Sequence, residues 1–112
     1  TVIALHNNTD GGYSLLSYLP GGSEAAAGAD VHRSGADTDN FFLVTQERLF
    51  RSLKARNFNV ALQDNRNAPE DGSLSVYCGK KGISYINVEA QHGDSAAQTQ
   101  MLKALFEILG AR

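Results

Sequence analysis

Near its end, the chain has a strand pattern followed directly by a helix pattern. This order limits the folds that the chain can adopt. Residues 83–90 (ISYINVEA) are rich in β-branched and aromatic residues, which favour a strand. The next segment has apolar residues at helical spacing, with Asp94 or Ser95 as its N-cap and Gly110 at its end. A strand followed by an amphipathic helix is typical of α/β domains, in which the helix packs back on the sheet.

The rest of the chain repeats this alternation. The expected elements are a strand at 1–5, a short strand or extended segment at 13–18, a helix from its N-cap Thr45 to about Arg56, a strand at 58–62 and a short helix within 73–81 that ends at Gly82. The Gly- and Ala-rich stretch 20–40 is expected to be a long surface loop, with Asp37 and Asp39 in solvent. We therefore predict an α/β fold with a mostly parallel or mixed sheet flanked by helices.

Charge and hydropathy argue against two classes of function. The net charge is −2 and the largest basic cluster is the pair Lys80-Lys81, whereas binding to phosphates needs many clustered cations. Apolar runs reach only about five residues, far short of the roughly 20 that span a bilayer. A single cysteine, Cys78, allows neither an internal disulfide nor a Cys-based zinc site. We expect no nucleic-acid partner and no membrane.

His6 is the first candidate functional residue, because it directly follows the first predicted strand. An imidazole at a strand end can ligate a metal while the backbone, Asn7 or Asn8 orients the ring. The alternative is a histidine that is hydrogen-bonded within a turn.

Glu89 is the second candidate. It lies near the end of an apolar strand, where a carboxylate is either paired or held desolvated. Beside a metal-bound water, such a group acts as general base and then as general acid, whereas the alternative is a salt bridge at the sheet edge. Ligands of open α/β sheets gather beyond the carboxyl ends of strands, so we expect His6 and Glu89 to face one crevice. His92, in the loop that follows, is either a second ligand, a proton donor or a surface histidine.

Two stretches of the chain resemble the zinc carboxypeptidase superfamily and its amidohydrolase-like relatives. In residues 3–22 (IALHNNTDGGYSLLSYLPGG), an apolar strand leads to His6 and then to a Gly-bearing turn at 18–21, as the family's strand leads to a zinc-binding His. In residues 72–89 (GSLSVYCGKKGISYINVE), a Gly-Ser start, a tyrosine-bearing segment and a Gly-Ile-x-Tyr entry precede Glu89 in the family's order. Ala-Leu-His-Asn-Asn with a late strand Glu is also similar to zinc-dependent N-acetylmuramoyl-L-alanine amidases.

The resemblance implies a phosphorylase/hydrolase-like α/β domain with zinc as cofactor, His6 as one zinc ligand and Glu89 as the catalytic residue. The family's His-x-x-Glu motif has no counterpart here, although catalytic zinc needs about three protein ligands. We therefore expect residues 1–112 to be the C-terminal part of a single zinc-hydrolase-like domain, with the other ligands in an N-terminal portion of the same protein; a second chain or a degenerate site are the alternatives. Candidates to bind substrate or to support the site are Asn7, Asn8, Tyr18, Tyr77 and His92.

The expected function is hydrolysis of an amide or peptide bond, carboxypeptidase-like or peptidoglycan amidase-like, on a peptide or cell-wall peptide. The Asn- and Gly-rich composition and the resemblance favour an extracellular or periplasmic location. The alternative is a non-catalytic α/β binding or interaction module, in which His6 is a turn histidine and Glu89 a paired carboxylate. Only the hydrolase requires these two side chains to converge on an exposed crevice.

Overall fold

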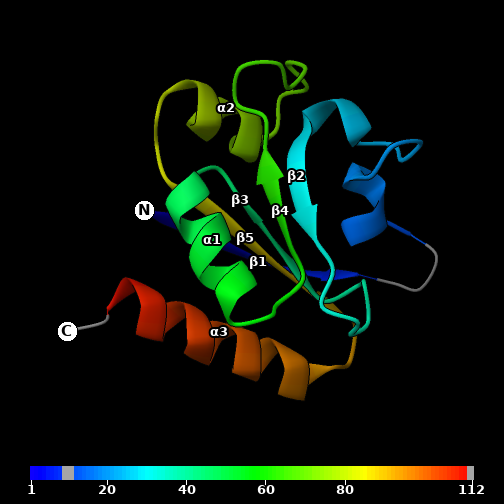
Figure 1. Cartoon of the computed structure of the whole chain (residues 1–112), viewed down its shortest axis with the longest axis vertical. Coiled ribbons are helices and arrows are strands. Elements are labelled where there is room, and N and C mark those ends of the chain that lie inside the picture. The colour runs from blue at the N-terminus through cyan, green and yellow to red at the C-terminus, as the bar shows by residue number, and fades with distance from the viewer. Residues whose placement is uncertain (9–11, 111–112) are drawn as a thin grey trace.

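The centre of the domain is a five-stranded mixed sheet with strand order β1-β5-β3-β4-β2, seen in a computed structural model that describes residues 1–8 and 12–110 (Figure 1). The strands are β1 (Val2–Asn8), β2 (Gly28–His32), β3 (Phe41–Val44), β4 (Val60–Gln63) and β5 (Tyr85–Gln91). The helices are α1 (Glu47–Ala55), α2 (Leu74–Lys80) and α3 (Ser95–Leu109), with two 3-10 turns, η1 (Leu15–Tyr18) and η2 (Ala25–Ala27). The predicted α/β class is confirmed.

The strand pairing brings together the candidate metal ligand, His6, and the candidate catalytic residue, Glu89. β1 pairs parallel with β5, and β3 pairs parallel with β4, while β5–β3 and β4–β2 are antiparallel. In the β1–β5 register, His6 lies opposite Glu89 and Ala4 lies opposite Asn87. Because directly opposed residues project from the same face of a sheet, these four side chains share one face.

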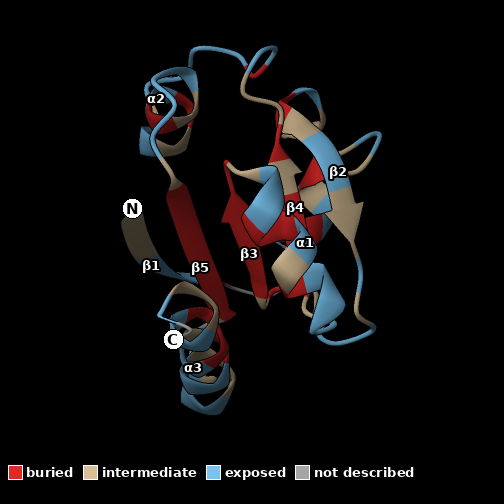
Figure 2. Cartoon of the chain, turned by 60° about the vertical axis from the view of Figure 1, so that its left-hand side comes forward, coloured by how far each residue is buried: buried red, intermediate tan, exposed pale blue. Residues whose placement is uncertain are grey.

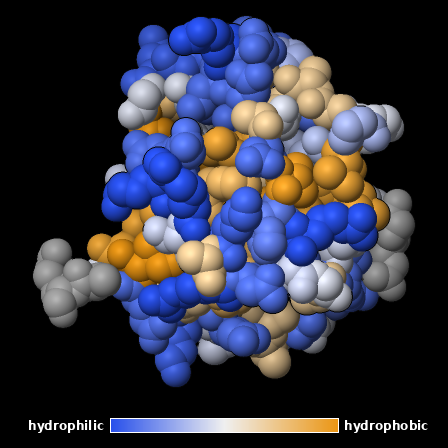
Figure 3. Space-filling model, in the orientation of Figure 1, coloured by the Kyte–Doolittle hydropathy of each residue, from blue (hydrophilic) through white to orange (hydrophobic). Residues whose placement is uncertain are grey.

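The sheet separates the hydrophobic core into two clusters, one on each of its faces. α1 and α3 cover one face of the sheet with the buried residues Phe42, Val44, Leu49, Phe50, Leu53, Val60, Ile86, Val88, Met101 and Leu105. The turns and α2 lie on the other face with the buried residues Leu15, Tyr18, Ala27, Phe41, Leu43, Ala61, Ala68 and Val76. Figure 2 shows β3 and β5 buried along almost their whole length, whereas β1 at the sheet edge is not. On the side of α1 and α3, hydrophobic residues are exposed in patches across the middle of the molecule, between hydrophilic residues (Figure 3).

Capping side chains explain where two of the helices begin. The Asp94 carboxylate accepts the backbone N–H of Ala97 at 3.0 Å, so Asp94 is the N-cap of α3, and Gly110 is its C-cap, as predicted. Ser73 caps α2 in the same way. Gly82 follows α2 with φ of +72°, a left-handed conformation that favours glycine. Among the described helices, none is long and apolar enough to cross a membrane.

Thr45 does not cap α1, and that prediction is wrong. Gln46 occupies the N-cap position. The Thr45 hydroxyl instead donates to the carbonyl of Ile83 at 3.1 Å and accepts the N–H of Tyr85 at 2.9 Å, and the residue is buried. Its side chain therefore extends the contact between β3 and β5, because a threonine hydroxyl satisfies backbone groups across a sheet as readily as at a helix end.

Three further expectations along residues 13–40 are wrong. Residues 13–18 do not form a strand, because Ser14 and Ser17 form a reciprocal capping pair that closes the turn η1. Residues 28–32 are not loop, since they form the edge strand β2 through antiparallel pairing with β4. Asp39 is 5% exposed rather than solvated, because its loop packs against the end of β1.

Candidate functional site

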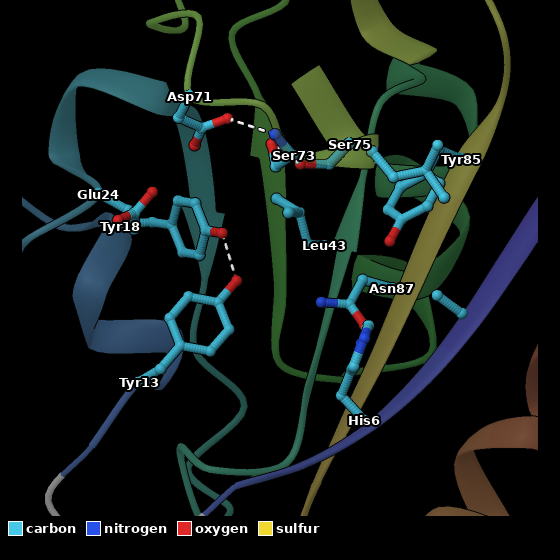
Figure 4. A pocket seen from close by; sticks show the side chains of 12 residues that line it. His6, Tyr13, Tyr18, Glu24, Leu43, Asp71, Ser73, Ser75, Tyr85 and Asn87 are labelled. Atoms are coloured by element: carbon cyan, nitrogen blue, oxygen red, sulfur yellow. Dashed lines mark hydrogen bonds between the residues drawn. The ribbon is translucent and has the colours of Figure 1, made fainter. Parts of the chain in front are cut away.

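A cavity of about 450 Å³ opens on the sheet face opposite α1 and α3 (Figure 4). Its floor comes from β1, β3 and β5, and its walls come from the η1–η2 segment on one side and from the start of α2 on the other. The lining residues are Ala4, His6, Tyr13, Tyr18, Glu24, Leu43, Asp71, Ser73, Leu74, Ser75, Tyr85 and Asn87. The cavity thus forms over the sheet itself and not beyond the strand ends, which corrects one part of the sequence-based expectation.

His6 lies at one end of this cavity with one ring nitrogen already engaged. Its Nδ1 is 2.6 Å from the Oδ1 atom of Asn87, and its side chain is 54% exposed. The carbonyl oxygen of Asn87 accepts, so the hydrogen bond assigns the proton to Nδ1. When the ring is neutral, Nε2 carries the lone pair, and this nitrogen has no partner among the described residues. This is the arrangement by which metal-ligating histidines are usually oriented.

Glu89 lies behind Asn87 and is almost completely buried. The Nδ2 atom of Asn87 donates to its Oε2 at 2.8 Å, and His6 Nδ1 is 3.5 Å from the same oxygen. Glu89 is 4% exposed, and its Oε1 has no hydrogen-bond partner among residues 1–8 and 12–110. A buried carboxylate oxygen without a partner costs stability, so such an atom points to a functional role. His6 and Glu89 are close together, as expected, but Glu89 is buried and is not among the residues that line the cavity, so they do not meet on an exposed crevice.

Burial shifts the acid–base behaviour of Glu89. Desolvation raises the pKa of this carboxyl group above its ordinary value of 4.5, while the Asn87 hydrogen bond and the charge of His6 oppose the shift. A general base needs a pKa closer to neutral pH than that of a free carboxylate. The burial of Glu89 therefore moves it in the direction that acid–base catalysis requires.

We expect this shift to appear as a pH dependence of folding stability. Because the folded state binds the Glu89 proton more tightly than the unfolded state, Glu89 favours folding below pH 4.5 and loses that contribution as the pH rises through the folded-state pKa. The free energy of unfolding of metal-free wild type, minus that of Glu89→Gln, should thus fall over this range. Urea titrations at a series of pH values test this, and a difference that stays constant or rises would contradict the shift.

Two tyrosines form the wall opposite Asn87. The hydroxyls of Tyr13 and Tyr18 are hydrogen-bonded to each other, and the Tyr13 ring packs edge-on against Phe41 with centroids 5.4 Å apart. Burial raises the pKa of both phenols, so both remain protonated and uncharged at neutral pH. Figure 4 shows both rings facing the cavity.

Tyr13 and Asn87 are two of the site residues that sequence reasoning missed. An extended segment would place Tyr13 and Tyr18 on opposite faces, whereas the turn η1 places them side by side. Asn87 had a usable signal, since it alternates with Tyr85 and Glu89 on a buried strand where an amide needs partners.

The other predicted site residues do not meet at the cavity. Asn7 is exposed and lies opposite Ala90 in the register, so it projects from the other face of the sheet. Asn8 is buried, and its Nδ2 donates to the carbonyl of Asp39 at 2.8 Å, which is a structural role. Tyr77 is 56% exposed on α2 beside Lys81.

His92 is exposed as well, and its backbone N–H donates to the carbonyl of Asn8 at 2.7 Å. It does not line the cavity. His6 is thus the sole histidine among the described residues that line the cavity, and residues 1–8 and 12–110 contain no group of three or more His, Cys, Asp or Glu side chains that could hold a metal ion. Comparisons with protein-family models, with curated proteins and with solved structures find no match to this chain.

Proposed function

We propose that this domain supplies one zinc ligand, His6, and the catalytic carboxylate, Glu89, of a hydrolase that cleaves amide or peptide bonds. The observation that carries the proposal is the pair itself: a buried carboxylate with an unpartnered oxygen lies 3.5 Å from a half-exposed imidazole on the wall of a cavity. Asn87 fixes the geometry between them. A structural salt bridge to Arg or Lys, the alternative expected for Glu89, is not found among the described residues.

The residues fit a zinc site in part. His6 has its Nδ1 held by Asn87 and its Nε2 available, which suits one ligand of a catalytic metal. Catalytic zinc takes about three protein ligands, so the others would come from outside the described residues. When bound, zinc would polarise the substrate carbonyl and lower the pKa of a bound water to about 7.

Glu89 would move the protons of the reaction. As the water oxygen bonds to the carbonyl carbon, the carboxylate takes the water proton; as the carbon–nitrogen bond breaks, it passes that proton to the leaving nitrogen. Its raised pKa favours the first step over an ordinary carboxylate, because a stronger base takes the water proton more readily. The protonated phenols of Tyr13 and Tyr18 provide neutral hydrogen-bonding groups across the cavity from Asn87, where a peptide backbone can lie.

We expect His6→Ala to lower zinc affinity by at least about 100-fold, because it removes a ligand. Asn87→Leu should lower zinc affinity by about 10- to 100-fold, because it removes the hydrogen bond that orients the His6 ring. The measurement is competition with a chromophoric chelator, on protein that carries its native flanking sequence. His32→Ala is the matched control, because His32 is bonded to Asn57 on the surface, away from the cavity. Equal zinc affinity in wild type and His6→Ala would contradict the metal assignment.

The alternative is a binding module without catalysis, and the absence of a three-ligand group among the described residues favours it. Under this alternative, the protein with its flanking sequence holds no zinc, and Glu89→Gln changes stability alone. The zinc measurement therefore separates the two.

A further inference from the structure

The two edge strands of the sheet differ in their protection against pairing with a further strand. β2, at one edge, is five residues long, carries the exposed Asp30 and has a register shift between Gly28 and Asp30. Short length, a charge and a bulge are features that keep edge strands from pairing. β1, at the other edge, has seven residues, no Lys, Arg, Asp, Glu or Pro, and an unbroken register with β5. The β1 edge therefore lacks the protection that β2 has.

The backbone hydrogen bonds of β1 show which of its groups are used within the sheet. The N–H of Val2 donates to the carbonyl of Ser84 at 2.8 Å. At the other end of the strand, the carbonyl of Asn8 accepts the N–H of His92 at 2.7 Å. The even-numbered residues of β1 thus turn their backbone groups towards β5.

The odd-numbered residues Ile3, Leu5 and Asn7 turn their backbone groups away from β5, because successive residues of a strand direct these groups to opposite sides. Figure 2 shows β1 beyond β5 at the edge of the sheet, and within the described part of the chain β1 pairs with no other strand. A row of outward N–H and C=O groups is satisfied best by another extended chain. The surface is therefore suited to a β-strand.

Leu5 adds an apolar side chain to this open edge. It lies opposite Val88 in the register, so it projects from the sheet face that α1 and α3 cover. Even so, Leu5 is 51% exposed. A strand beside β1 would remove much of this apolar surface from water, which favours association.

We infer that β1 pairs with β1 of a second copy of this chain, antiparallel and about a two-fold axis at Leu5, so that the two sheets join into one. Leu5 is the middle residue of β1, so this register pairs the whole strand. Leu5 faces the partner's Leu5, and Ile3 faces the partner's Asn7, as hydrogen-bonded pairs. Since each such pair exchanges two bonds, the interface has roughly six backbone hydrogen bonds.

Symmetry favours a second copy over an unrelated strand. A two-fold pair places residues of the same type near one another, so a Lys or Glu near the middle of β1 would repel its equivalent. β1 instead has the apolar Leu5 at its centre. Because the other edge of the sheet, β2, is protected, the assembly closes as a dimer and does not grow into a fibre.

The dimer has a consequence for the cavity. Ala4 and His6 both line it, and they project from the same face of β1. In the register centred on Leu5, His6 lies opposite the partner's Ala4, so the partner's strand borders each cavity and both cavities open on one face of the joined sheet. The inference does not rest on the proposed function, because a dimer that binds no zinc would leave it intact.

Sedimentation equilibrium of the full-length protein tests the dimer. We expect a dissociation constant on the order of 10 to 100 µM, because one pair of strands is a small interface. Leu5→Lys should raise this constant at least about tenfold, because it opposes two like charges. Asn7→Pro should do the same, because it removes an outward N–H that β5 does not use. Leu16→Lys is the matched control, since Leu16 is 42% exposed on η1, which contacts β2 and β4.

A cysteine at position 5 tests the register itself. In a hydrogen-bonded antiparallel pair the Cα atoms are about 5.5 Å apart, which a disulfide can span. Leu5→Cys should therefore form a covalent dimer under mild oxidation, whereas Leu16→Cys should not. The native Cys78 does not compete, because it is 2% exposed.

Three results would overturn the inference: a wild type that stays monomeric up to several hundred micromolar, undiminished dimerisation in a folded Leu5→Lys or Asn7→Pro variant, or no cross-link in Leu5→Cys. Urea denaturation shows whether each variant is folded. Asn7→Pro and Leu5→Cys keep the test decisive if Leu5→Lys fails to fold. A monomeric wild type with zinc-dependent hydrolysis would refute the dimer alone, whereas a dimer without zinc binding would refute the proposed hydrolase alone.

Discussion

Replacement of Glu89 by Gln should lower the rate of amide hydrolysis at least about 100-fold, because a positioned general base contributes roughly 10²- to 10⁴-fold. Glutamine has the same shape, and its oxygen can still accept the hydrogen bond from Asn87 Nδ2 that now measures 2.8 Å. It cannot take a proton from water. Turnover of peptide amides, measured on the full-length protein supplied with zinc, tests this.

The same variant should be more stable than wild type by about 1 kcal/mol at neutral pH, since it removes a buried charge with an unpartnered oxygen. Zinc affinity should be unchanged, because Glu89 is not assigned as a ligand. Glu47→Gln serves as control, being exposed in an ion pair with Arg51, and should change neither rate nor stability appreciably.

Full activity in Glu89→Gln would refute the catalytic assignment. A loss of several kcal/mol of stability would show instead that the carboxylate is a structural partner of His6 and Asn87. The combination of lost turnover with gained stability is the specific signature of a residue kept for chemistry at the expense of folding.

Elements with local sequence signals could be predicted. β5 and α3 were expected because an apolar run, an N-cap at Asp94 and a terminal Gly110 all act within a few residues of one another. β2 could not be predicted, since its five residues, GADVH, become a strand only through pairing with β4. The same holds for Thr45, whose hydroxyl bonds to Ile83, a residue distant in the sequence.

Only part of the candidate site could be predicted from the sequence. Residue type and strand position were enough to single out His6 and Glu89, but the pairing of β1 with β5 that sets them side by side depends on tertiary structure. The cavity depends on tertiary structure: Glu24 comes from the stretch 20–40 that was expected to be loop, Asp71 lies outside every predicted element, and only the folded arrangement sets them across from His6.

Asn59 should be the most costly polar side chain to truncate, and its role links the core to the site. It is 2% exposed, its Oδ1 accepts from Ser34 N–H at 2.7 Å and from the Ser34 hydroxyl at 3.1 Å, and its Nδ2 donates to the carbonyls of Asp37 at 3.0 Å and Asn40 at 3.1 Å. This one amide fixes the whole 34–40 loop. The loop in turn holds the start of β3.

The anchored loop also supports the strands that carry the site. Asn40 Oδ1 accepts the backbone N–H of Gln91 at 2.7 Å at the end of β5, and Asn40 Nδ2 donates to the N-cap carboxylate of Asp94 at 3.3 Å. At the end of β1, Asn8 Nδ2 donates to the carbonyl of Asp39 at 2.8 Å. The loop therefore joins the ends of the two strands that hold His6 and Glu89 in register.

We expect Asn59→Ala to lower the free energy of unfolding by about 3 kcal/mol, because it leaves several buried backbone groups without partners at roughly 1–3 kcal/mol each, partly relieved by water. The melting temperature should fall by about 10 °C. Urea denaturation at neutral pH provides the measurement, and Asn67→Ala, which removes an exposed amide bonded to Asp64, should cost less than about 0.5 kcal/mol. If both variants lost equally little free energy of unfolding, other contacts would hold the 34–40 loop in place. The register of β1 and β5 at the site would then not depend on Asn59.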